Sequence, residues 1–204
     1  MREPFRAAAA IMGAAGIALS FLYGGESRNP DTAQRIMRFL SFFTIQANLL
    51  ALLAMLVPVL APRSRTGSIF ASPPLRGAIL GYLVVVALVY HFLLRGAWHL
   101  QGPGLAASSI LHYVSPLMFA LDWLLFVPKG RVAWRKAFVC LVYPAVYLVW
   151  TLGHGALGGW YPYSFLDAVR LGYPAVLLNV AGISAAFLLL ELLLIALDRN
   201  LASR

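Results

Sequence analysis

Six long apolar runs divide this chain, and they constrain its fold more than any other feature of the sequence. A helix needs about 20 mostly apolar residues to cross the ~30 Å hydrocarbon layer of a membrane, because it rises ~1.5 Å per residue. The runs are 6–24, 38–61, 77–98, 106–127, 136–154 and 174–197. They predict an all-α integral membrane protein, a bundle of six transmembrane helices forming a single domain over residues 1–204. The first run is longer than the apolar core of a usual signal peptide, so we expect it to be retained as a helix.

The basic residues stand between the apolar runs and favour one orientation. Eleven of the 16 Lys and Arg residues fall at the N-terminus, in the second and fourth loops and in the C-terminal tail, and five fall in the other three loops. Because cytoplasmic segments are enriched in Lys and Arg, this distribution predicts that both termini are cytoplasmic. The net charge is +9, but the cations form short tracts instead of one water-exposed face. We therefore expect a membrane-embedded chain with no nucleic-acid partner.

Polar side chains converge toward the outer half of this predicted bundle. Thr44 and His112 each lie about two turns, or ~10 Å, inside the outer surface. The ionisable residues placed at this end are His91, Arg95, His99, His112 and His154. Such side chains are costly within a span and usually face the bundle interior, so the convergence predicts a functional site there. Asp122 and Glu191 fall in the inner half, where we expect them to pair with Lys or Arg from the inner loops.

Thr44 and His112 are candidates for a nucleophile and its general base. A neutral imidazole within hydrogen-bonding distance can take the hydroxyl proton as the oxygen attacks an ester, and the acyl-threonine is then hydrolysed by water with the same histidine as base. The oxyanion needs fixed donors, for which Asn48 and Arg95 are the local candidates. Asp122 lies ~15 Å from His112 along one helix, so we expect any third group that orients the imidazole to come from another helix.

Further polar and aromatic residues around this pair are candidates for the wall of a substrate pocket. They are Ser41, His91, Ser115, His154, Trp160 and Tyr163. Ser41, Thr44 and Asn48 have the spacing of one helical stripe, and Trp160 and Tyr163 belong to the loop expected over the mouth of the site. Each has an ordinary alternative, since a threonine in a membrane helix usually bonds the carbonyl four residues earlier and an asparagine often joins two helices.

Several sequence motifs resemble those of a bacterial group of small membrane proteins. Residues 42–48, FFTIQAN, resemble its FTxQ(S/A)N signature, and the runs His112–Pro116, Asp122–Phe126 and Gly159–Asp167 follow in the same order and spacing, over more than half of the chain. Two residues depart from the pattern: His154 stands where the group has Arg, and Ser164 replaces a proline. The group is similar, more distantly, to the androgen-induced (FAR-17a-like) hydrolases of animals, atypical threonine hydrolases that cleave fatty acid esters of hydroxy fatty acids.

The resemblance implies that Thr44 is the nucleophile and His112 the general acid/base of a lipid ester hydrolase in the bacterial cytoplasmic membrane. The substrate would enter from the outer leaflet, and no metal or organic cofactor is required. Two alternatives remain. A haem-binding electron carrier would use His91, His112 or His154 as axial ligands. A non-catalytic transporter or lipid-binding scaffold would need no reacting group, although transporters often carry an internal repeat and none is evident here. The sequence specifies no oligomeric state.

Overall fold

The apolar runs fold as long helices. A helix satisfies its backbone polar groups internally, so an apolar run in this form exposes only apolar side chains. The computed structural model describes residues 1–25, 31–96 and 100–202, and these residues form helices and no strand. Six helical stretches are long and apolar enough to cross a membrane: Arg2–Tyr23, Phe43–Leu60, Pro73–Leu94, Gly102–Phe126, Lys136–Gly158 and Tyr173–Ala202. The all-α class and the number of candidate spans are thus as predicted, with boundaries that differ from the prediction by a few residues.

Three of these stretches are compound. The chain forms α1 (Arg2–Tyr23), α2 (Thr32–Leu40), α3 (Phe43–Leu60), α4 (Arg65–Ala71) and α5 (Pro73–Val89), and α5 continues into the π-helical turn η2 (Tyr90–Leu94). The fourth stretch consists of α6 (Gly102–Ser109), the π-helical turn η3 (Ile110–Val114) and α7 (Ser115–Phe126). The rest is α8 (Lys136–Val139), α9 (Val142–Gly158), the 3-10 turn η4 (Ser164–Leu166), α10 (Ala168–Leu171) and α11 (Tyr173–Ala202).

The predicted helix over 38–61 is wrong at its start, because the chain breaks between α2 and α3. Phe42 is extended, with φ −77° and ψ 125°, and α3 begins at the next residue. Side chains satisfy the freed carbonyls at the end of α2: Ser41 Oγ donates to Met37 O at 2.8 Å, and Gln46 Nε2 donates to Leu40 O at 2.8 Å. Ser41 therefore does not share a helical stripe with Thr44, which lies in the first turn of α3.

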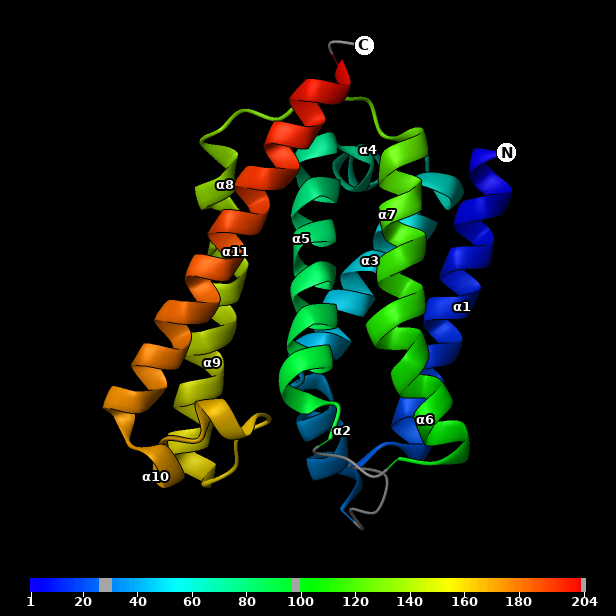
Figure 1. Ribbon diagram of the computed structural model, residues 1–204. Helices are drawn as coiled ribbons and strands as arrows, with labels where there is room; N and C mark the ends of the chain where they lie inside the picture. The colour runs from blue at the N-terminus through cyan, green and yellow to red at the C-terminus, as the bar shows by residue number, and fades with distance from the viewer. Residues whose placement is uncertain (26–30, 97–99, 203–204) are drawn as a thin grey trace.

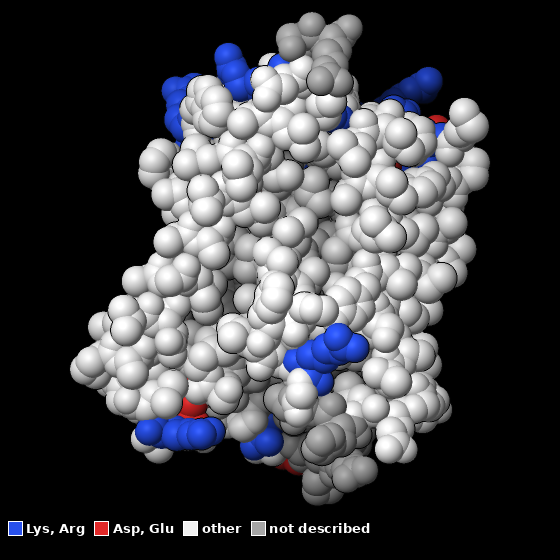
Figure 2. Space-filling model, in the orientation of Figure 1, with Lys and Arg blue, Asp and Glu red and all other residues white. Residues whose placement is uncertain are grey.

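The helices form two adjoining groups (Figure 1). In the first group α1 packs against α3, α6 and α7, and α5 packs against α3 and α7. The second group is the hairpin of α9 and α11, which borders the first through contacts of α11 with α5. Both termini lie at the same end of the bundle, as an even number of crossings requires (Figure 1). Lys and Arg gather toward the two ends, and the surface between them is largely free of charge (Figure 2).

Tyrosine hydroxyls connect α9 to the first group. Tyr82 on α5 donates to Cys140 O at 2.8 Å. In the other direction, Tyr143 donates to Gln46 Oε1 at 2.6 Å and Tyr147 donates to Ser41 O at 3.0 Å. These rings meet around Phe43, which has edge or tilted contacts with both α9 tyrosines. Each buried hydroxyl thus finds a partner across the seam between the two groups, as buried tyrosines usually do.

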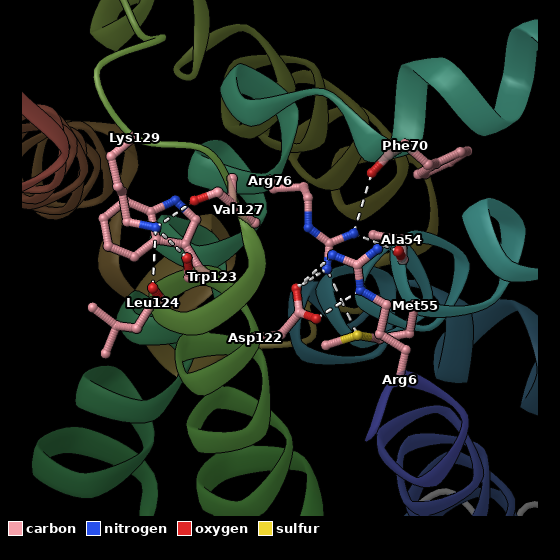
Figure 3. Close-up of polar contacts among 10 residues, drawn as sticks. All are labelled: Arg6, Ala54, Met55, Phe70, Arg76, Asp122, Trp123, Leu124, Val127 and Lys129. Carbon is pink, nitrogen blue, oxygen red and sulfur yellow. Dashed lines mark hydrogen bonds and ion pairs between the residues drawn. The ribbon is translucent and has the colours of Figure 1, made fainter. Parts of the chain in front are cut away.

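A buried ion cluster lies near the end that carries the termini (Figure 3). Arg6 donates to both carboxylate oxygens of Asp122, from Nε at 2.6 Å and Nη2 at 3.2 Å, and Arg76 Nη2 also donates to Asp122. The Ala54 carbonyl accepts a further hydrogen bond from Arg76 Nη1 at 2.6 Å. The three side chains are almost inaccessible: Arg6 is 5% exposed, and Arg76 and Asp122 are 0% exposed. The predicted pairing of Asp122 with basic residues is confirmed.

The same prediction is wrong for Glu191. This residue is buried where α11 packs against α5, and it forms no ion pair among the described residues. Its Oε1 atom has no hydrogen-bond partner there. The carboxylate occupies the space left by Gly81, since a Cβ at that glycine would collide with it. The approach of α11 to a glycine on α5 buries the carboxylate away from the basic residues of the connecting segments.

Candidate functional site

Thr44 and His112 are in contact in the structure. Thr44 is 9% exposed, and its Oγ1 lies 3.4 Å from His112 Nε2. The same oxygen lies 3.4 Å from the hydroxyl of Tyr163. The ordinary alternative for the threonine, a bond to the Leu40 carbonyl, is not made: that carbonyl belongs to α2 and accepts from Gln46 instead. The break before α3 thus leaves the Thr44 hydroxyl directed at the imidazole.

The imidazole of His112 is fixed by its own helix and by a neighbouring ring. Nδ1 lies 2.8 Å from the Ser108 carbonyl and 3.2 Å from Ser108 Oγ. A carbonyl only accepts, so Nδ1 carries the proton in that bond and Nε2 presents its lone pair to Thr44. The ring stacks on Tyr90 with centroids 3.8 Å apart and planes 15° apart. The expectation of an orienting group from another helix was therefore wrong for the hydrogen bond, because Ser108 lies one turn earlier in the same stretch.

Two π-helical turns place the stacked rings. Tyr90 begins η2 and His112 is the middle residue of η3. Single π-helical turns widen a helix locally and occur frequently at functional sites. Pro116 follows η3 and has no N–H to bond a carbonyl of the preceding turn, which leaves the Leu111 carbonyl open to a side chain. Asn48 donates to it at 3.2 Å.

Asn48 holds the two halves of the site together. Its Nδ2 donates to Thr44 O at 2.9 Å as well as to Leu111 O, so both amide protons are used by backbone carbonyls. The side chain is buried, and its Oδ1 has no hydrogen-bond partner among the described residues. Asn48 therefore joins α3 to η3 and positions Thr44 and His112, and it has no free proton for an oxyanion.

Tyr163 lies inside the site and not over its mouth. It belongs to the segment before η4, it is buried, and its hydroxyl accepts from the backbone N–H of Thr44 at 3.3 Å. Its ring stacks on Phe165, with centroids 5.1 Å apart, and meets Phe42 edge-on. Burial raises the pKa of Tyr163, despite the hydrogen bonds with Thr44 that act to lower it. The phenol therefore keeps its proton at neutral pH and can donate it in a hydrogen bond.

The other candidate residues lie away from this centre. Arg95 and His91 are exposed, and His91 Nδ1 lies 3.2 Å from Tyr113 OH. Ser41 and Ser115 are buried elsewhere, Ser41 bonded to α2 and Ser115 with no hydrogen-bond partner for Oγ among the described residues. The ring of His154 contacts Trp150 and Trp160. Trp160 in turn lies edge-on to Phe42. His99 lies outside the described residues.

Thr44 lines two cavities. The larger, about 300 Å³, lies between α3, α5, α9 and α11 and extends along the seam between the two helix groups. Its wall is almost wholly apolar and includes Val86, Leu148, Val180, Ile183 and Phe187. The smaller, about 110 Å³, lies between the end of α1, α3, α6 and η3, and its wall contains the hydroxyls of Ser20 and Ser108. Thr44, Leu94 and Tyr163 line both cavities, whereas His112 lines only the smaller one.

The groups that orient His112 were missed in the sequence. Ser108 stands four residues before the histidine, one helical turn away, and this spacing alone would have suggested the contact. Tyr90 gave no such signal, because its stacking depends on how two distant helices pack.

No protein-family model matches this sequence, and comparisons with curated proteins and with solved structures gave no match.

Proposed function

We propose that this chain is an intramembrane hydrolase of lipid esters, of the kind that cleaves fatty acid esters of hydroxy fatty acids. The observation that carries the proposal is the contact between Thr44 Oγ1 and His112 Nε2, at a threonine that lines two cavities. Their separation of 3.4 Å is long for a hydrogen bond, and catalytic hydrogen bonds commonly shorten when substrate binds. The motif resemblance assigns the same two residues as nucleophile and acid/base.

The first half of the reaction forms an acyl-threonine. As Thr44 Oγ1 attacks the ester carbonyl, its proton passes to His112 Nε2 and the carbonyl oxygen becomes an oxyanion. When this intermediate collapses, the bond to the alcohol oxygen breaks and His112 gives that oxygen the proton. In the second half, water attacks the acyl-threonine, its proton passes through His112 to Thr44 Oγ1, and the fatty acid leaves.

Two donors near Thr44 are suited to the oxyanion. One is the Tyr163 hydroxyl, which retains its proton because the group is buried. The other is the Thr44 backbone N–H in the first turn of α3, where the helix dipole favours negative charge; it donates to the Tyr163 hydroxyl at 3.3 Å and would transfer this bond to the oxyanion. Fixed donors of this type commonly supply 10²–10³-fold of the rate. They replace Asn48 and Arg95, which the sequence suggested for this role.

Chemical labelling tests the nucleophile. The detergent-purified protein, treated with a fluorophosphonate probe, should be labelled on Thr44, and Thr44→Ala should abolish the label. Thr151→Ala is the matched control, because Thr151 is a buried threonine on α9 outside both cavities. Labelling that persists in Thr44→Ala would exclude Thr44 as the nucleophile.

Turnover tests the function as a whole. Hydrolysis of a fatty acid ester of a hydroxy fatty acid should fall by ~10²–10⁴-fold in His112→Ala, the usual effect of losing a general base. Equal turnover in the two proteins would contradict the mechanism. A Soret band in the purified protein would instead favour the haem carrier, although His112 stacks on Tyr90 and His91 lies beside Tyr113. A lack of turnover with any ester would favour the lipid-binding scaffold.

A further inference from the structure

The two cavities differ in a way that assigns the two arms of the substrate. Both are lined by Thr44, so an ester bound at this residue has both cavities within reach. Only the smaller cavity is lined by His112. The larger is lined by aliphatic and aromatic side chains of the seam, and apart from Thr44 its hydroxyl-bearing residues are Ser184, Tyr147 and Tyr163.

The position of the acid decides which arm lies where. In the proposed reaction, His112 returns the proton to the alcohol oxygen, so this oxygen must lie within hydrogen-bonding distance of Nε2. The alcohol arm therefore begins at the smaller cavity. The acyl chain leaves the carbonyl carbon by a different bond from the alcohol oxygen, and the cavity that Thr44 lines without His112 is the larger one.

We infer that the cavity between α3, α5, α9 and α11 is the binding site of the acyl chain, and that the smaller cavity beside His112 receives the alcohol arm. The inference rests on the proposed function. A methylene is close in size to a water molecule, whose share of the liquid is ~30 Å³, so the 300 Å³ cavity holds about ten carbons. The 110 Å³ cavity holds the first ~4 carbons of the alcohol arm by the same measure.

The exposed surroundings of the larger cavity fit a chain that arrives from lipid. It lies along the seam where α9 and α11 adjoin α5 (Figure 1). The face of the molecule seen in Figure 2 carries most of its charged side chains toward the ends and is otherwise uncharged, apart from one basic group set in from the lower end. A largely uncharged surface of this kind suits a substrate that is dissolved in the bilayer.

Two series of esters test the assignment: one varies the acyl chain with the alcohol fixed, and the other varies the alcohol with the acyl chain fixed. With the alcohol fixed, kcat/KM should rise about fourfold for each added methylene, equivalent to ~0.8 kcal/mol, and level off near ten acyl carbons. Ile183→Trp, which fills the larger cavity, should lower kcat/KM for long acyl chains by more than tenfold, a much larger loss than for acetyl esters. Leu178→Trp is the matched control: it lies on the same helix, 74% exposed and outside the cavity, and should keep the wild-type profile. A shift in alcohol preference in Ile183→Trp, or no shift in either series, would overturn the assignment.

A binding measurement separates this inference from the proposed chemistry. A ten-carbon fatty acid with a terminal diazirine should crosslink wild type and His112→Ala on residues 141–148 or 180–187, and Ile183→Trp should reduce the yield. Crosslinks confined to residues 100–112 would overturn the site. Crosslinking at the expected residues in a protein that hydrolyses no ester would refute the proposed function and keep the acyl-chain site.

Discussion

Removing the carboxylate of Asp122 should destabilise the protein strongly, because this group neutralises two buried arginines. Arg6 and Arg76 both donate to it, and both side chains are buried. In Asp122→Asn the shape is preserved but the two cations face each other without an anion. Breaking one buried ion pair costs ~3–5 kcal/mol, so we expect at least that loss. For a chain of this size, each kcal/mol lowers the melting temperature by ~2–4 °C, which gives a decrease of ~6–20 °C.

Thermal unfolding of the detergent-solubilised protein, followed by tryptophan fluorescence, measures this effect. Asp167→Asn is the control, since Asp167 caps the short helix α10 with a partly exposed side chain and asparagine is about as good an N-cap, so this change should cost little stability. Arg6→Met adds an internal comparison: it leaves Arg76 neutralised by Asp122 and should be milder than Asp122→Asn. Equal effects of Asp122→Asn and the control, or a larger effect of Arg6→Met, would refute the charge-balance argument.

Three further predictions concern the site. Asn48→Leu leaves the Thr44 and Leu111 carbonyls without their donor, so it should cost ~1–3 kcal/mol in thermal stability and lower kcat more than it changes KM; an unchanged kcat would rule out a positioning role. Gly16→Val places a side chain against η3 at Ile110, where overpacking costs ~1–3 kcal/mol, so both melting temperature and ester hydrolysis should fall, whereas Gly77→Val, which meets open space, should change neither. Burial raises the pKa of Tyr163, so above pH ~10 the unfolded chain loses the phenol proton before the folded protein does. The free energy of unfolding should therefore fall less steeply with pH in Tyr163→Phe than in wild type, by up to ~1.4 kcal/mol per pH unit. Identical slopes in a pH series of chemical denaturation would contradict this.

The apolar runs and the Lys/Arg distribution were sufficient to predict the helical class, the candidate spans and the common depth of Thr44 and His112. The break before α3 was not predictable from hydrophobicity, because residues 39–43 read as one continuous apolar segment apart from Ser41. The ion pairing of Asp122 was predictable, because the basic residues expected at the same depth in the bundle belong to segments next to its helix. The burial of Glu191 beside Gly81 depends on the approach of α11 to α5, which residue spacing does not encode.

The inward position of Tyr163 was also beyond the reach of the sequence. Aromatic residues in a segment between two spans are typical of a membrane interface, and nothing local distinguishes this tyrosine from Tyr161 or Tyr173. Its place is set by stacking on Phe165 and by contact with Phe42, the residue at which α3 starts. A tertiary contact thus brings the phenol to the threonine.

The lining of both cavities by Thr44 has a consequence for how the reaction would end. In the proposed reaction, cleavage at Thr44 would leave each product in a separate cavity. The liberated fatty acid would drift back into the hydrocarbon along the path by which it came, while the alcohol departs on the histidine side, so neither product obstructs the exit of the other.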